Sequence, residues 1–310
     1  MTKEKFMQSQ KFGILLVICC GIMWGISGVL GQYVFQVSEV NSTQITVLRQ
    51  FISGVVLLLI SFMKNGKRSF AIFKGGKKFI GFFLFALTGI MGVQYTYFLA
   101  IENSNAATGT VIQFTYIIMI LIYTALVLKK TPKIYETAAI LCAFVGIFLI
   151  ATHGSINSLA VSKEALFWGL VSAVCFSIYC LYPQELYREF DLINVIGWGS
   201  LIASIVLACI TRTFYFPSVS PSVFVSCMGV AIVGTLIPFI LYGMGIGILG
   251  SVKASLFVTV EPISSGILTW ICFGTKFTFP DIFGFFLILG AIELVSVISF
   301  REEKKKITNI

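Results

Sequence analysis

The stretch Lys253-Ala-Ser-Leu-Phe-Val-Thr-Val-Glu-Pro-Ile-Ser-Ser-Gly-Ile-Leu-Thr-Trp270 places Glu261 and Pro262 in the middle of a mostly apolar run that is long enough to cross a bilayer. A carboxylate at membrane depth is costly unless it faces protein or a water-filled cavity. Pro262 has no N–H, so it leaves the carbonyl of Val258 without its usual helical hydrogen bond. Both features predict that this helix faces a polar interior.

The spacing of the residues around Glu261 predicts which face of this helix turns inward. Residues three, four and seven positions apart lie on one face of a helix. The residues that share the face of Glu261 are Ala254, Phe257, Val258, Ser264, Ser265 and Leu268. The opposite face carries Leu256, Val260, Ile263 and Ile267, which are typical of a surface that meets lipid or packs closely.

The composition of the whole chain is that of an integral membrane protein. Of its 310 residues, 57% are hydrophobic and only 11% are charged, against about a quarter charged in soluble domains; the mean hydropathy is +0.97. Apolar windows of about 20 residues predict ten membrane helices. These windows are roughly 12–33, 43–63, 79–101, 105–128, 134–152, 165–184, 192–211, 222–246, 252–273 and 281–300. The connections that remain are too short to hold a soluble catalytic domain.

The net charge of +9 is distributed in the manner of membrane topology rather than of nucleic-acid binding. Lys and Arg concentrate in the tail 1–11, the loop 64–78 and the tail 301–310, which an even number of helices places on one side. Only Lys163, Arg212 and Lys276 fall on the other side. The positive-inside rule therefore predicts cytoplasmic termini and a multi-pass protein of the cytoplasmic membrane.

The second half of the chain matches the first in the order and length of its predicted helices. A shift of 146 residues aligns 109–116 with 255–262, and a shift of 152 pairs Trp24 with Phe176. Five helices per repeat is an odd number, so the second copy must enter the membrane with the opposite polarity. We therefore expect an all-α integral membrane fold, with ten transmembrane helices arranged as two inverted five-helix repeats around a central cavity. The expected segments are a tail at 1–11, repeats at 12–152 and 165–300, an extracellular linker at 153–164 and a basic tail at 301–310.

Polar and aromatic residues inside the predicted helices are candidates for the cavity wall. Such groups need partners within the membrane, so they serve either to join helices or to bind a polar solute, and the sequence favours neither. The candidates for substrate binding or coupling are Glu261, Trp24, Gln94, Tyr95, Tyr97, Gln113, Tyr116 and Tyr179. Arg49 is expected about 9 Å below a helix end, within partial snorkelling reach of the surface, where an ion pair or helix-end role is as plausible as substrate binding.

Several positions weaken the predicted helices of the second half. Broken helices in membrane proteins commonly supply moving parts, although ordinary kinked packing is an equal alternative. The hinge candidates are Pro262, Pro238, Gly243 and Gly245. Glu293 lies in an otherwise apolar helix, outside the main pathway, and needs a partner, for which a second protomer in a homodimer is one source.

At this point the chain resembles the drug/metabolite transporter superfamily, and within it the EamA type, over residues 12–300. The motifs that carry the likeness are Met23-Trp24-Gly25, Leu48-Arg49-Gln50-Phe51, Glu261-Pro262 and Gly284-Phe-Phe-Leu-Ile-Leu-Gly-Ala291. The resemblance implies two EamA-like repeats and export, or less often uptake, of small metabolites such as amino acids. The family pattern usually has a Glu after the fourth and ninth helices. The corresponding residues of this chain, 129–132 and 275–278, include no Glu, so the likeness implies no particular substrate.

The sequence and the resemblance together favour a secondary transporter that works by alternating access on a small polar or amphipathic solute, with export as the expected direction. Glu261 would couple protons or pair with a substrate amine, because burial disfavours the ionised form of a carboxyl. The alternatives are a channel or non-transporting scaffold, and an intramembrane enzyme, for which no HExxH, GxSxG or Asp pair is present. The eight cysteines have no metal-site spacing. We expect no cofactor, no metal and no nucleic-acid partner.

Overall fold

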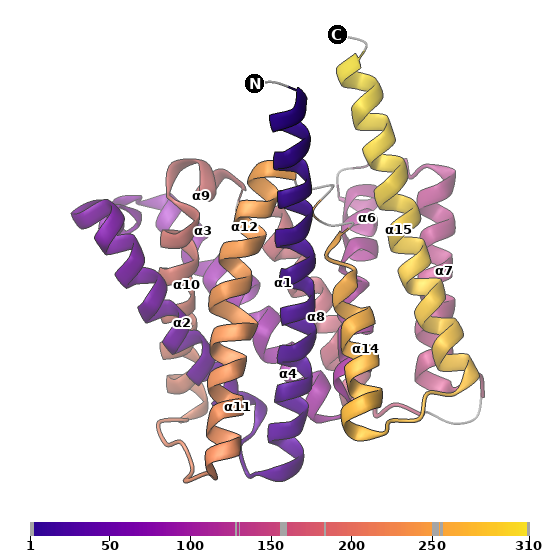
Figure 1. The fold of residues 1–310 in the computed structure, drawn as a ribbon, viewed down its shortest axis with the longest axis horizontal. Coiled ribbons are helices and arrows are strands. Elements are labelled where there is room, and N and C mark those ends of the chain that lie inside the picture. The colour runs from indigo at the N-terminus through magenta and orange to yellow at the C-terminus, as the bar shows by residue number, and fades with distance from the viewer. Residues whose placement is uncertain are drawn as a thin grey trace.

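The fold was analysed in a computed structural model, which describes residues 3–127, 129, 131–155, 160–182, 184–249, 254 and 257–308. The described residues form helices and connecting loops, with no strand among them. Figure 1 shows the helices side by side in one bundle, with both ends of the chain at the same end of it. We call this the terminal end.

The first half contains nine helical elements, three of which join into one membrane crossing. They are α1 (Lys3–Val37), α2 (Ser42–Asn65), the 3₁₀ segment η1 (Gly66–Lys74), α3 (Lys77–Phe85), the π turn η2 (Ala86–Met91), α4 (Gly92–Glu102), α5 (Ala106–Phe114), α6 (Tyr116–Leu126) and α7 (Ile134–Thr152). Elements α3, η2 and α4 form one crossing, and α5 and α6 form another that is interrupted at Thr115.

The second half follows the same plan. Its elements are α8 (Lys163–Leu181), α9 (Gln184–Glu189), α10 (Leu192–Thr211), α11 (Pro221–Ala231), the π turn η3 (Ile232–Leu236), α12 (Ile237–Leu249), α14 (Val260–Phe273) and α15 (Phe279–Thr308). Within the described residues, nine helical stretches are long and apolar enough to cross a membrane, and α14 is a shorter apolar helix. The chain is therefore a multi-pass membrane protein. Residues Lys253, Ser255 and Leu256 of the predicted ninth helix lie outside the described part of the chain.

The two π turns mark the internal repeat in space. They begin at Ala86 and Ile232, which are separated by the predicted shift of 146 residues. In Figure 1 the crossing that contains α4 runs away from the terminal end, whereas α11 and α12 run toward it. The ninth crossing is broken like the fourth, since Thr115 (φ −63°, ψ −2°) and Thr259 (φ −63°, ψ −8°) adopt almost the same backbone conformation. The repeats are thus inverted copies of one another.

The packing pairs equivalent helices from the two repeats. α2 packs against α10, α5 against α14, and α7 against α15; α1 packs against α12 as its counterpart α8 packs against α4. At the end of the outer pair, His153 Nε2 lies 3.0 Å from Asp281 Oδ1. This arrangement leaves the centre of the bundle to helices of both repeats.

Side-chain caps start the helices at the end of the bundle away from the termini. Asn41 and Asn105 each accept a 2.9 Å hydrogen bond from the backbone N–H three residues later. Ser162 and Ser220 do the same for α8 and α11. Each cap satisfies an N–H that the first turn of a helix leaves free, so these short polar residues fix where the chain re-enters the bundle.

Glycines on α1 allow its backbone to touch α14. A Cβ atom added at Gly21 would lie 2.6 Å from Val260 Cγ1, and one at Gly25 would overlap Ser264 Oγ. Small residues at helix interfaces permit this close approach. The same contact turns Glu261 inward with 5% of its surface exposed, whereas Ile263 and Ile267 on the opposite face are 51% and 53% exposed. The predicted faces are therefore confirmed at Glu261, Ile263 and Ile267, whereas Leu256 lies outside the described residues.

Candidate functional site

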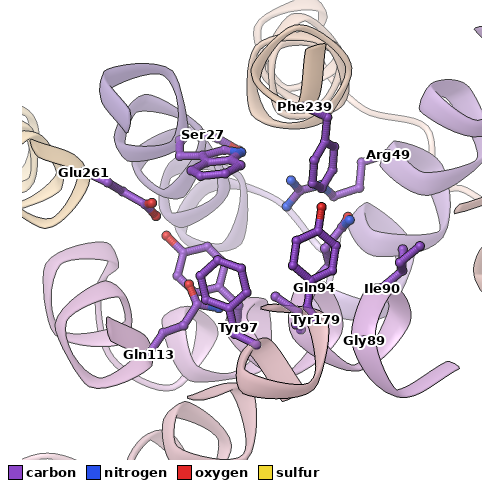
Figure 2. A pocket seen from close by; sticks show the side chains of 13 residues that line it. Ser27, Arg49, Gly89, Ile90, Gln94, Tyr97, Gln113, Tyr179, Phe239 and Glu261 are labelled. Atoms are coloured by element: carbon purple, nitrogen blue, oxygen red, sulfur yellow. The ribbon is translucent and has the colours of Figure 1, made fainter. Parts of the chain in front are cut away.

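A cavity lies between the two repeats (Figure 2). Helices α1, α2, η2, α4 and α5 of the first repeat and α8, α12 and α14 of the second contribute to its wall. Its lining residues are Trp24, Ser27, Arg49, Gly89, Ile90, Val93, Gln94, Tyr97, Gln113, Phe176, Tyr179, Phe239 and Glu261. The cavity thus combines an aromatic wall with one acidic and one basic side chain.

Glu261 lies in the first turn of α14, directly after the break at Val258 and Thr259. The expectation that Pro262 leaves the Val258 carbonyl free is wrong, because the Glu261 N–H donates a 2.9 Å hydrogen bond to that oxygen. Pro262 itself sits in the first turn of the helix, where a missing N–H costs little. Within the described residues the Glu261 carboxylate has neither a hydrogen bond nor an ion pair, and Figure 2 shows it pointing into the cavity.

Arg49 points into the bundle and not toward its surface, so the snorkelling expectation is wrong. The side chain is 5% exposed. Its Nε donates a 2.8 Å hydrogen bond to Thr235 Oγ1, and its Nη2 donates one of 2.8 Å to the carbonyl of Gly234. That carbonyl lies four residues before Pro238, which has no N–H to give it. The guanidinium thus takes the place of a missing helical donor, and its carbon lies 4.8 Å from the centre of the Phe98 ring.

The neighbouring residue on α2 contacts the π turn of its own repeat. Gln50 Nε2 donates a 3.3 Å hydrogen bond to the carbonyl of Ile90 in η2, while Arg49 bonds the equivalent turn η3. π turns interrupt the regular helical pattern and are frequent at functional sites. One pair of consecutive side chains therefore ties both irregular turns to α2.

Two polar residues of the cavity wall are partly used to join helices. Gln113 Nε2 donates a 2.6 Å hydrogen bond to Ser172 Oγ, which in turn donates to the carbonyl of Val93. The hydroxyls of Tyr97 and Thr110 lie 2.8 Å apart. These contacts connect α4, α5 and α8, so the joining role that the sequence left open applies at these positions.

Two other polar residues of the wall have no hydrogen-bond partner in the part of the chain that the structure describes. Gln94 is 5% exposed and Ser27 is 2% exposed. Neither amide atom of Gln94 makes a hydrogen bond, and the Ser27 hydroxyl makes none. Buried polar groups are nearly always paired with protein or water, so these atoms are available to a ligand.

The aromatic wall is formed by four rings from three helices. Trp24 and Phe239 have ring centroids 6.1 Å apart, Tyr179 and Phe239 are 6.0 Å apart, and Phe176 and Tyr179 are 5.7 Å apart. Such rings offer a broad apolar surface to the body of a solute. Phe176 and Phe239 were not predicted, although the repeat alignment that pairs Trp24 with Phe176 contained the signal for the first of them.

Six of the eight predicted site residues line the cavity, and two do not. Those that do are Trp24, Gln94, Tyr97, Gln113, Tyr179 and Glu261. The hydroxyl of Tyr95 instead accepts a 3.2 Å hydrogen bond from Thr43 in the first turn of α2. Tyr116 is 3% exposed and packs against Phe176 behind the wall.

The predicted hinge positions lie at close helix contacts. A Cβ atom at Gly243 would overlap Leu192, and one at Gly245 would overlap Val17. Pro238 opens α12 directly after η3, as Pro262 follows the break in the ninth crossing. A role for these four residues in movement stays a prediction.

Glu293 has a partner within its own chain, so the expectation that a second protomer supplies one loses its basis. Thr259 Oγ1 donates a 2.5 Å hydrogen bond to Glu293 Oε1. The second membrane carboxyl thus contacts the break in the ninth crossing, two residues before Glu261. No group of three metal-binding side chains occurs in the part of the chain that the structure describes.

A family model, curated relatives and a solved structure match most of the chain. The EamA-like transporter family matches residues 11–152 and 163–297. The "Uncharacterized inner membrane transporter YicL" of Salmonella typhimurium is 35% identical over 96% of this chain and 99% of its own length. The "Uncharacterized transporter YyaM" of Bacillus subtilis is 21% identical, over 82% of this chain and 84% of its own. A solved structure titled "Crystal structure of protein" matches with a TM-score of 0.61 at 15% identity, over 94% of this chain and 98% of that one, a likeness in fold alone.

Proposed function

Because this chain belongs to the EamA-like transporter family, we propose that it is a secondary transporter that works by alternating access. The solute is a small polar or amphipathic metabolite, with an amino-acid-like compound as the candidate, and the direction of transport is export. The observation that carries the proposal is the cavity between the inverted repeats, in which the buried Glu261 carboxylate makes no hydrogen bond or ion pair with another described residue. Inverted repeats of transporters place the solute site at this position, and rocking of one repeat against the other opens it to each side in turn.

The role we propose for Glu261 is to couple this movement to a proton or to a positive group on the solute. An ionised carboxyl is costly to carry through a dry membrane interior. Reorientation of the cavity is therefore favoured when Glu261 is neutralised, either by a proton or by a substrate amine. A coupled carrier needs this dependence on neutralisation, because a carrier with an empty cavity and an ionised Glu261 then reorients slowly.

The remaining predicted residues would hold the solute. Trp24 and Tyr179 supply apolar faces, and Gln94, Tyr97 and Gln113 supply polar groups around the same space. Tyr95 and Tyr116 lie outside this lining, so we propose no solute contact for them in this conformation. In the membrane, we propose that both termini face the cytoplasm, in keeping with the basic tails and the loop 64–78.

The experiment that tests the proposal starts from the purified full-length protein. A panel of small metabolites is screened for thermal stabilisation, because a ligand that binds the native state raises its apparent stability. Stabilising compounds are then tested for counterflow in proteoliposomes. A carrier accelerates uptake of labelled solute when unlabelled solute is present on the opposite side, whereas a channel or a scaffold gives no acceleration and would overturn the proposal.

A further inference from the structure

The cavity wall opposite Glu261 carries polar groups that the protein leaves available. Figure 2 shows Arg49 and Gln94 on one side of the cavity and Glu261 on the other. Ser27 belongs to the same side as Arg49, since a Cβ atom at Gly234 would overlap the Ser27 hydroxyl and lie 3.5 Å from Arg49 Nη2. We propose that Ser27, Arg49 and Gln94 form a binding subsite for a carboxylate group of the solute, an inference that rests on the proposed function.

Arg49 supplies a positive charge that is not in direct contact with an acid, since Glu261 lies on the opposite side of the cavity. Arg49 forms no ion pair with another described residue; the pairs that do form include Lys64 with Asp191, Lys78 with Glu189 and His153 with Asp281. Its contacts to the carbonyl of Gly234 and the hydroxyl of Thr235 use two of the five N–H donors of a guanidinium. When Glu261 is neutralised by a proton or a substrate amine, as proposed above, Arg49 is left without a counter-charge and favours an anionic ligand that reaches its free donors.

Gln94 and Ser27 complete the donor set. The amide of Gln94 has two free N–H donors and the hydroxyl of Ser27 has one, all within a wall that is at least nine-tenths buried. The two oxygens of a carboxylate accept several such bonds at once. A buried carboxylate needs a positive group to pair with its charge and further donors for its remaining lone pairs. Arg49 supplies the charge, and Gln94 and Ser27 supply the neutral donors.

The charge balance selects a carboxylate over other groups. With Glu261 neutralised, a single carboxylate balances Arg49, whereas a doubly charged phosphate would leave one negative charge uncompensated in a membrane cavity, which is expensive. An amine would meet Arg49 as a like charge. Glu261 on the opposite side disfavours a second negative group, so the subsite accepts one carboxylate on a body that covers the aromatic wall.

The test compares two probes of equal shape, 3-phenylpropionate and 3-phenylpropionamide, by titration calorimetry on the purified full-length protein. Both carry an apolar ring, and only the first carries a negative charge. We expect the carboxylate to bind about tenfold or more tightly than the amide, the scale of hydrogen bonds to charged groups. The measurement is repeated with Glu261→Gln, which removes the opposing acid and should raise the affinity for the carboxylate but not for the amide.

Three substitutions locate the subsite. Ser27→Ala and Gln94→Leu remove groups without a partner, so the fold should persist, and each should reduce the preference for the carboxylate at least threefold, within the range of a single polar contact. Arg49→Gln should abolish the preference. Ser200→Ala is the matched control, because the Ser200 hydroxyl is also buried and unpaired but lies outside the cavity; it should change nothing.

Three outcomes would overturn the subsite. The two probes could bind with equal affinity, or neither could bind to the unsubstituted protein or to the Glu261→Gln protein. The preference for the carboxylate could also survive the Ser27 and Gln94 substitutions. The outcome for the carrier is read separately. If uncharged or cationic solutes undergo counterflow while the carboxylate preference is absent, the subsite is wrong and the carrier stands. If the preference is present but no bound compound shows counterflow, the carrier is wrong and the subsite stands.

Discussion

Arg49 Nη2 donates a 2.8 Å hydrogen bond to the carbonyl oxygen of Gly234, the oxygen that Pro238 cannot engage. The Arg49 side chain on the second crossing thus donates a hydrogen bond in place of the N–H that Pro238 lacks on the eighth crossing, across the interface between the two repeats. This contact links a charged residue of the cavity to the π turn η3, and its energetic weight can be measured.

Substitution of Arg49 by Leu should destabilise the protein, because the Gly234 carbonyl and the Thr235 hydroxyl then lose their donor at a cost of roughly 1–3 kcal/mol each. Pro238→Ala restores an N–H that can bond the Gly234 carbonyl, so the loss on Arg49→Leu should be smaller in the presence of Pro238→Ala. Thermal unfolding of the four proteins in detergent measures this coupling. Equal losses with and without Pro238→Ala would show that the carbonyl is not the relevant partner.

Substitution of Gly25 by Ala should weaken the contact between α1 and α14. The added methyl group overlaps Ser264 Oγ and lies 3.0 Å from the Ser265 backbone nitrogen, and overpacking of this kind costs about 1–3 kcal/mol. Gly266→Ala on α14, the other helix of this contact, is the control, since nothing lies within 4 Å of its added Cβ. A lower melting temperature is expected for Gly25→Ala alone. If both variants melt alike, the two helices do not approach as closely as described.

Substitution of Thr259 by Val should leave the Glu293 carboxyl without the donor that holds it at 2.5 Å. A buried acceptor left unpaired costs roughly 1–3 kcal/mol, whereas replacement of both partners by apolar groups is nearly neutral. The double variant Thr259→Val with Glu293→Leu should therefore be more stable than Thr259→Val alone, as measured by thermal unfolding. If adding Glu293→Leu does not restore any of the lost stability, the hydrogen bond between Thr259 and Glu293 does not contribute to it.

Substitution of Glu261 by Gln should remove the response of transport to a pH gradient. In a one-for-one exchange of solute and proton, a gradient of one pH unit can sustain up to about a tenfold solute gradient, because both correspond to 1.4 kcal/mol. Steady-state accumulation in proteoliposomes measures this ratio, which should fall to one for Glu261→Gln. Glu293→Gln is the matched control, since Gln keeps the oxygen that accepts from Thr259. Full accumulation by Glu261→Gln would exclude proton coupling through this residue.

Substitution of Tyr179 by Ala should raise the KM for counterflow of a solute found in the screen. Loss of an aromatic contact of about 0.5–1.5 kcal/mol corresponds to roughly a two- to tenfold change. Tyr95→Ala is the comparison, because Tyr95 bonds Thr43 and does not line the cavity; its KM should stay near that of the unsubstituted protein. An effect of Tyr95→Ala equal to that of Tyr179→Ala would mean that the described lining is not the solute site.

The sequence alone determined the features that depend on local periodicity and on transfer from water to lipid. Ten apolar windows, their grouping into two repeats and the inward face of the Glu261 helix all follow from which side chains tolerate lipid. Ile263 and Ile267 are half exposed and Glu261 is buried, as the helical spacing requires. These properties are carried by each segment itself, so no knowledge of its neighbours was needed.

The tertiary structure decided which neighbour each inward side chain meets. Tyr95 and Tyr97 are two residues apart and therefore point to nearly opposite sides of one helix, yet nothing in the sequence tells which side faces the cavity. Depth alone puts Arg49 within partial snorkelling reach of the surface, whereas its actual partner is a carbonyl four residues before a proline in another helix. A residue's own sequence neighbourhood fixes its direction about its own helix axis, whereas partners between crossings depend on how all the helices pack together.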